Sequence, residues 1–354
     1  MRIKDLGTQL NKWLRPIPTT QKAIIQEPME TQTLSKDQNR LCEILNEMPI
    51  INDARTLVIC QARSEGYGED SCLSLRHEGR IFLGAFDGCG GSGAKVYPSF
   101  GGHTGAWAAS RAASLAARDW FLESDENEAF AAQVNRALQL CRDQEPDGQI
   151  LMGSLSREFP TTIAAFVKSV DSDVVTFFWC GDSRCYMLDA DGLHQITPDD
   201  TDIKDAMRSL REDAPMTNVA CASRGFEVHH ASLRIEKPSL VFAATDGCFG
   251  YLTSPMSFER LLLETMSRAN DMRVWKKKLN EQFNAISGDD YTLAAWMHGF
   301  DSFREMKKAL TIRLDYLNAH YPADTTDEEA LFVQWDRYRA SYESMMIDLS
   351  IERG

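Results

Sequence analysis

The sequence lacks the features that mark several broad classes of protein. No stretch approaches the eighteen or so uninterrupted apolar residues that a membrane-spanning helix needs, and the N-terminal segment has no long apolar run with a cleavage-like site. Internal repeats and low-complexity tracts are also missing. We therefore expect a soluble, cytoplasmic, globular protein that has no membrane partner.

Positive charge is scarce as well. Lysine and arginine number 38 against 52 aspartates and glutamates, which gives a net charge of −14. An acidic surface repels a polyphosphate backbone, so a nucleic-acid partner is not expected. The same excess arises when carboxylates gather to hold metal ions, and that explanation depends on where the acidic residues stand.

Cysteine is present at nine positions, but no two cysteines form a CxxC pair. Several lie inside apolar, strand-like runs. This pattern argues against a disulfide framework and against a structural zinc site. It favours reduced, buried thiols in a reducing compartment.

Three regions can be recognised along the chain. Residues 1–54 are predicted to be an extension, with a short amphipathic helix at Leu6–Leu14 and a second helix around 36–47. Residues 55–298 carry nearly all the strand-like patterns and form the predicted catalytic domain. Residues 299–354 are predicted to be a helical extension.

Strands and helices in the central region are clustered rather than alternating. Predicted strands cover 56–60, 71–76, 80–86, 161–168, 173–180, 183–189, 227–234, 239–245 and 291–297. Predicted helices cover 104–120, 125–143, 256–268 and 271–286, and the second starts at a capping pair of Asp125 and Glu128. This order predicts an α+β protein in which sheet layers are flanked by helix pairs.

The C-terminal extension is predicted to contain two helices. The first spans 301–319 and ends at Tyr321-Pro322, and the second begins at a capping box of Thr326 and Glu329. One face of the second helix carries the stripe Leu331, Trp335, Tyr338, Tyr342 and Met345. We favour packing of this stripe against the core, while the alternative is a partner that binds the C-terminal helix.

Acidic residues recur where predicted strands begin or end. They are Glu69-Asp70, Asp87-Gly88, Asp182, Asp246-Gly247 and Asp289. A single Asp-Gly is usually only a turn. Five acidic turns at strand ends could converge, and carboxylate oxygens are the ligands that Mg²⁺ and Mn²⁺ prefer. The spacing therefore predicts a metal-dependent hydrolase.

A resemblance makes this prediction more specific. The segments EDSCLSL, FLGAFDGCGG, FPTTIAAFV, FFWCGDSRCYMLDADGLHQITPDD, LVFAATDGCFGYL and GDDYTLAAW occur in that order. In order and content they resemble the conserved blocks of the protein phosphatase 2C family, in a divergent form like that of bacterial members. The resemblance spans roughly residues 55–298.

The resemblance implies a fold and a set of ligands. The fold would be a four-layer αββα sandwich of two antiparallel β-sheets between helix pairs, here with helical N- and C-terminal extensions. Two Mn²⁺ or Mg²⁺ ions would be held by Asp87, the Gly88 carbonyl, Asp246 and Asp289. Glu69 and Asp70 would act through metal-bound waters, Asp182 would lie near a third metal seen in many relatives, and 198–225 would form a flap beside the site.

Two departures from the family pattern concern catalysis. Cys89 stands where some members have a histidine thought to protonate the leaving group, and His103 is the nearest other candidate acid. Glu65 stands where an arginine often grips the phosphate, which leaves Arg63 as the candidate substrate-binding residue. Asp290 follows Asp289, so either carboxylate could be the ligand.

The leading functional hypothesis is a metal-dependent serine/threonine protein phosphatase acting on a phosphoprotein, such as a kinase or the target of a kinase. The alternative is a pseudophosphatase, weak or inactive, whose fold serves as a binding or scaffold module. The departures favour the alternative, whereas the complete set of metal carboxylates favours the enzyme. A nuclease is disfavoured by the charge.

Overall fold

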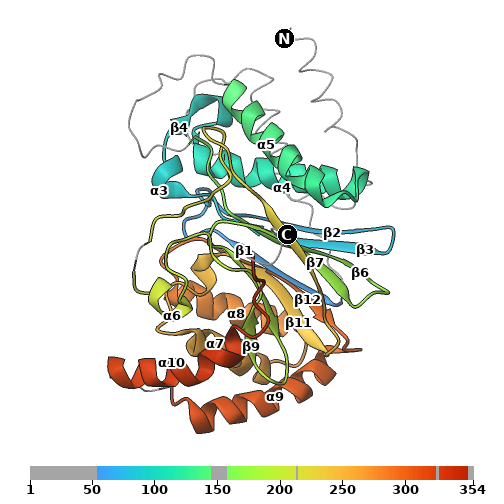
Figure 1. Cartoon of the computed structure of the whole chain (residues 1–354), viewed down its shortest axis with the longest axis vertical. Coiled ribbons are helices and arrows are strands. Elements are labelled where there is room, and N and C mark those ends of the chain that lie inside the picture. The colour runs from blue at the N-terminus through green and yellow to red at the C-terminus, as the bar shows by residue number, and fades with distance from the viewer. Residues whose placement is uncertain (1–53, 145–157, 213, 324–326, 350–354) are drawn as a thin grey trace.

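Two five-stranded antiparallel sheets form the centre of the molecule in the computed structural model, which describes residues 54–144, 158–212, 214–323 and 327–349 (Figure 1). The two helices predicted within 1–53 lie outside these ranges. Within them, no helix has both the length and the apolar character that a membrane crossing requires.

The two sheets place strands from distant parts of the chain side by side. In spatial order, the first sheet consists of β1 (Thr56–Gln61), β12 (Tyr291–His298), β11 (Ser239–Ala244), β8 (Arg184–Leu188) and β9 (Leu193–Gln195). The second sheet consists of β10 (His229–Arg234), β7 (Val174–Cys180), β6 (Ile163–Ser169), β3 (Arg80–Phe86) and β2 (Ser71–His77). Every pair of neighbours is antiparallel.

Helices cover the outer face of each sheet (Figure 1). The second sheet is covered by α4 (Gly105–Glu123) and α5 (Asn127–Asp143), and the first by α7 (Pro255–Ser267) and α8 (Met272–Ile286). Buried side chains such as Leu83, Phe166 and Val241 fill the space between the sheets. The predicted four-layer αββα sandwich is confirmed.

Short elements were missing from the sequence prediction because they are too brief to show a period. They are α3 (Gly90–Gly93), β4 (Val96–Tyr97), η1 (Pro98–Phe100), β5 (His103–Thr104), β9, α6 (Ala206–Ser209) and η2 (Asp246–Cys248). The long elements were predicted to within a few residues, since burial of one face fixes their hydrophobic period.

Two predicted helix caps are wrong. Helix α5 is preceded by Glu126, whose side chain makes no capping hydrogen bond, so Asp125 and Glu128 do not form the predicted pair. Helix α10 (Glu328–Tyr342) is capped by Asp327, whose side chain accepts from the Ala330 N–H. Thr326 lies outside the described residues. A carboxylate at the N-cap serves the same orphan N–H groups as the predicted threonine hydroxyl.

The C-terminal helices pack on the sandwich. Helix α9 (Phe303–His320) lies against α7, and α10 contacts α7 and β9. Leu331, Trp335, Tyr338 and Tyr342 of the stripe are buried in the core formed with the first sheet, and Met345 packs against the core between the sheets. The favoured prediction for this stripe is confirmed, so its aromatic face is not open to a partner.

One buried ion pair joins α7, α9 and α10. Arg313 Nε lies 2.7 Å from Glu259 Oε1, and Arg313 Nη2 donates to Oε2 at 3.1 Å. The Tyr338 hydroxyl donates to the same Oε2 at 2.6 Å. Burial and the neighbouring Glu259 charge raise the pKa of Tyr338 well above its ordinary value, which keeps the phenol protonated as a donor.

We expect Glu259→Gln to lower the free energy of unfolding by about 3 kcal/mol, because it leaves the Arg313 guanidinium buried without its counter-charge. Urea unfolding followed by circular dichroism measures this. Glu264→Gln on the same helix is the matched control, because its pair with Arg268 is exposed and contributes at most about 0.5 kcal/mol. Equal unfolding midpoints for the two variants would contradict the structural role of the pair.

Candidate active site

Acidic residues from both sheets converge at one end of the sandwich. Asp87 directly follows β3, and Asp246 lies just beyond β11 in η2. Asp289 precedes β12, Asp182 lies in the turn between β7 and β8, and Glu69-Asp70 immediately precede β2. Strand ends hold these side chains on a rigid frame, as the sequence pattern predicted.

The electrostatics show that these carboxylates act on one another. Burial raises the pKa of Asp87 well above its ordinary value, and the charges of Asp70, Asp246 and Asp182 raise it further. Burial and then the Asp246 charge raise the pKa of Asp182 to about 7. Burial and then the Asp289 charge raise the pKa of Asp246 to about 6. The structure therefore brings the predicted carboxylates into one field of mutual repulsion.

One oxygen of the carboxylate group is available to a cation. Asp182 Oδ1 is buried and has no hydrogen-bond partner among the described residues, so a lone pair there is free to bind a metal or its water. A side chain at Gly88 would collide with the Ala106 carbonyl oxygen, because the added Cβ would lie 2.5 Å from it. Among the described residues, no three His, Cys, Asp or Glu side chains already stand in the arrangement of a coordination shell.

Threonines hold two of the carboxylates. The Thr245 hydroxyl donates to Asp70 Oδ2 at 2.9 Å and accepts from the Thr292 N–H at 2.9 Å, so it links Asp70 to the first sheet. The Thr104 hydroxyl donates to Glu69 Oε1 and accepts from the Trp107 N–H as the cap of α4. Because each threonine is fixed at both ends, it restricts the rotamer of its carboxylate.

The adjacent carboxylates Asp289 and Asp290 have different environments. Asp290 accepts hydrogen bonds from the backbone N–H groups of Arg63 and Glu69, and so it ties down the loop before β2. The Asp289 charge acts on Asp246 and Asp87. Asp289 therefore belongs to the same electrostatic group as Asp246 and Asp87.

The candidate phosphate and acid residues lie at the edge of the carboxylate group. Arg63 is exposed, and its backbone N–H is held by Asp290 at 2.6 Å. The His103 ring stacks on Trp107, with ring centroids 4.0 Å apart, and burial lowers its pKa. The Cys89 Sγ contacts the Asp87 carbonyl oxygen, and burial raises its pKa well above its ordinary value. Neutral Cys89 is therefore a poor acid.

Arg111 was missed by the sequence prediction. It lies in a cleft of about 350 Å³ together with Asp70, His103 and Trp107. Its guanidinium lies over the Trp107 ring at 4.4 Å, burial lowers its pKa to about 10, and its Nε has no partner among the described residues. An arginine in an alanine-rich helix, four residues after a tryptophan, was the signal available in the sequence.

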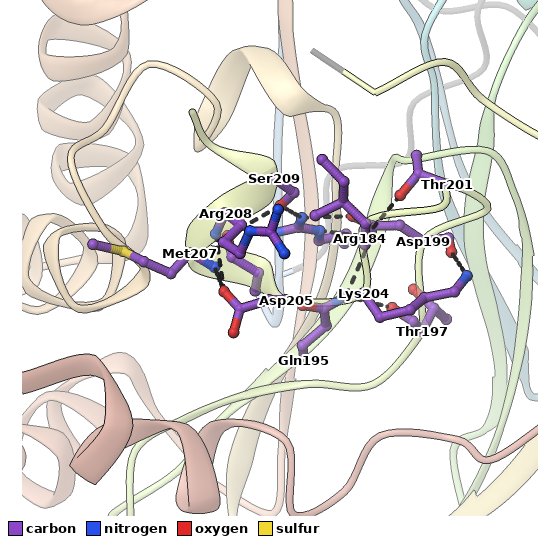
Figure 2. A network of polar contacts seen from close by, with 12 residues as sticks. Arg184, Gln195, Thr197, Asp199, Thr201, Lys204, Asp205, Met207, Arg208 and Ser209 are labelled. Atoms are coloured by element: carbon purple, nitrogen blue, oxygen red, sulfur yellow. Dashed lines mark hydrogen bonds and ion pairs between the residues drawn. The ribbon is translucent and has the colours of Figure 1, made fainter. Parts of the chain in front are cut away.

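A second cleft of about 400 Å³ opens on the side of Asp182 and Asp246. Arg184 in its wall is fixed by Asp199, with Nε–Oδ1 at 2.8 Å and Nη2–Oδ2 at 2.6 Å, and Nη2 also donates to Ser209 at 2.9 Å (Figure 2). Ser209 belongs to α6. The segment 198–225, predicted to be a flap, therefore borders the carboxylate group through this network.

Comparisons with known proteins agree with this architecture. A model of the protein phosphatase 2C family matches residues 62–284. The fold is similar to that of the Mycobacterium tuberculosis serine/threonine phosphatase PstP/Ppp, with a TM-score of 0.52 and 17% identity over 69% of this chain and 97% of that chain. It is also similar to Stp1 from Staphylococcus aureus, with a TM-score of 0.54 and 15% identity over 72% of this chain and 99% of that chain. No curated protein sequence matched.

We expect Asp246→Asn to stabilise the metal-free protein at pH 7.5, raising its melting temperature by roughly 2–4 °C, because it removes a half-buried charge from a repelling group. The folded pKa of about 6 exceeds the ordinary 3.8, so ionisation of Asp246 destabilises the fold as pH rises between these values. The difference should disappear near pH 4. Differential scanning calorimetry in chelator measures both values.

The control for this experiment is Asp171→Asn, which removes an exposed carboxylate from the turn between β6 and β7. Mn²⁺ should raise the melting temperature of the wild type and of this control more than that of Asp246→Asn. A destabilised Asp246→Asn protein in chelator at pH 7.5 would mean that the carboxylates do not repel one another.

Proposed function

Because the chain belongs to the protein phosphatase 2C family, we propose that it is a metal-dependent serine/threonine protein phosphatase that hydrolyses phosphomonoesters. The observation that carries the proposal is a group of mutually repelling carboxylates supplied by both sheets beside an open cleft. In this group Asp70 is buried, and Asp87, Asp182 and Asp246 are half-buried. Bound cations would balance these negative charges.

We propose the ligand set that the resemblance to the family implies. Asp87, the Gly88 carbonyl, Asp246 and Asp289 would hold two Mn²⁺ or Mg²⁺ ions, with Glu69 and Asp70 acting through waters and Asp182 beside a third ion. Such ions supply a water that ionises at neutral pH and charge neutralisation for a phosphoryl group. Hydrogen bonds from Thr245 and Thr104 restrict the side chains of Asp70 and Glu69 within the carboxylate group.

Binding of the phosphate and protonation of the leaving group would depend on other residues of the chain. Arg184 is locked to Asp199, so it holds the wall of the cleft rather than binding a substrate anion. Arg63 is exposed beside the carboxylates and remains the proposed phosphate-binding residue. Cys89 is half-buried beside Asp87 and its pKa is raised, so this thiol would give little help in protonating the leaving group.

The proposed catalytic domain is 55–298, since β12 completes the first sheet beyond the end of the family match at residue 284. The proposed substrate is a phosphoprotein, either a kinase or the target of a kinase, in the cytoplasm. The pseudophosphatase alternative keeps the same fold without turnover, and the first experiment separates the two.

Phosphate release from p-nitrophenyl phosphate and from phosphothreonine peptides should require Mn²⁺ or Mg²⁺ and stop in chelator. Asp87→Asn and Asp246→Asn should each lower kcat/KM by more than about 100-fold, because each removes a charged ligand of the metals. Asp171→Asn should act like the wild type. Metal-bound, folded protein that turns over neither substrate would support the scaffold alternative.

A second prediction concerns the leaving group. The wild type should hydrolyse aryl phosphates in preference to alkyl phosphates, because an aryl oxide leaves without help from an acid. Cys89→His should raise the ratio of alkyl to aryl turnover by about tenfold, measured as kcat/KM in metal-loaded protein. Cys89→Ser is the size-matched control. An unchanged ratio in Cys89→His would show that position 89 does not reach the leaving group.

A further inference from the structure

The C-terminal helix α10 contacts the α6 segment, which borders the cleft that contains Asp182 and Asp246. Asp205 caps α6 with Oδ1, which accepts from the Met207 and Arg208 N–H groups, as Figure 2 shows. Its Oδ2 accepts from Trp335 Nε1 at 3.1 Å and from Arg339 Nη1 at 3.0 Å, both on α10. Helix α10 and the segment that borders the cleft are therefore fixed to each other.

Arg211 lies two residues after α6 and lines the same cleft. Its Nε lies 3.3 Å from Glu328 Oε1, and its guanidinium lies over the Phe332 ring at 5.1 Å. Its Nη1 donates to the Met207 carbonyl at 3.3 Å. A guanidinium held by stacking and one backbone bond is already oriented, so little conformational entropy is lost when it binds an anion.

The two arginines of the cleft differ in how freely they can exchange partners. The Arg184 and Asp199 side chains are only 4% and 8% exposed, and removing a partner from such a buried pair leaves an uncompensated charge. The Glu328 side chain is 71% exposed and meets Arg211 by one contact. A surface pair of this kind contributes little to stability, so a substrate anion can replace Glu328 easily.

We propose that Arg211, positioned by Phe332 and in competition with Glu328, binds an acidic side chain of the phosphopeptide next to its phosphorylated residue. This inference rests on the proposed function. Arg211 shares the cleft with Asp182 and Asp246, so a peptide whose phosphoryl group lies at the carboxylates passes this guanidinium. Glu328 and Phe332 lie beyond residue 284, where the family match ends. The C-terminal extension thus supplies a determinant of substrate choice.

The test uses two phosphothreonine peptides that differ only in their flanks, Asp and Glu in one and Asn and Gln in its neutral twin. In metal-loaded wild type, the acidic peptide should have a KM about fivefold lower than the neutral twin. Arg211→Gln should bring the ratio of the two KM values to about one. Glu328→Gln should strengthen the preference for the acidic peptide about twofold, because it removes the competitor.

The matched control is Arg337→Gln, which makes the same change of charge at an exposed position of α10 and should keep the wild-type ratio. Arg211→Lys keeps the charge but loses the flat stacking surface, so it should retain part of the preference. Melting temperatures confirm that each variant is folded. A wild-type ratio in Arg211→Gln, or a weaker preference in Glu328→Gln, would overturn the proposal.

The result remains interpretable if the proposed function fails. Fluorescence anisotropy with labelled forms of the same two peptides reports binding without turnover. Preferential binding of the acidic peptide that disappears in Arg211→Gln supports this site even in a protein that hydrolyses nothing. Equal binding of both peptides by the wild type refutes the site, whatever the protein does to phosphoesters.

Discussion

Repulsion within one group of carboxylates is the constraint that the rest of the candidate site must accommodate. The pKa of Asp87, for example, is raised by the charges of Asp70, Asp182, Asp246 and Asp289. Partial burial limits the water that can screen these charges, so protonation or bound cations would stabilise the group. The proposal of metal-dependent hydrolysis rests on this argument.

The sandwich brings the carboxylates together and fixes their positions. Antiparallel sheets bring strand ends from distant parts of the chain to one edge, and hydrogen bonds across that edge fix the side chains. Thr245 connects Asp70 to the Thr292 backbone, and Asp290 ties the loop before β2 to the start of β12. The network of Arg184 and Asp199 extends this order to α6 (Figure 2). The carboxylates are therefore held apart by the scaffold rather than by their own contacts.

Local patterns in the sequence predicted the long strands and helices and the acidic positions, because burial of one face imposes a period and glycine marks the abrupt strand ends at Asp87 and Asp246. They could not predict Arg111, whose surroundings come from Glu69 and Trp107 together. The prediction of the α10 cap failed for a related reason. Several polar residues near Asp327 could each accept a hydrogen bond from the same N–H groups at the start of the helix. Features that depend on contacts between distant segments cannot be predicted from a local sequence pattern.

The C-terminal helices show how an addition to a fold can change recognition without disturbing chemistry. Burying Glu259 against Arg313 and Tyr338 fixes α9 and α10 to α7. That rigid attachment lets α10 place Glu328 and Phe332 beside Arg211 at the cleft. A buried network is costly to rearrange and an exposed pair is not. The strong contacts therefore set the position of the helix, and the weak contact at its first residue is the one free to respond to a substrate.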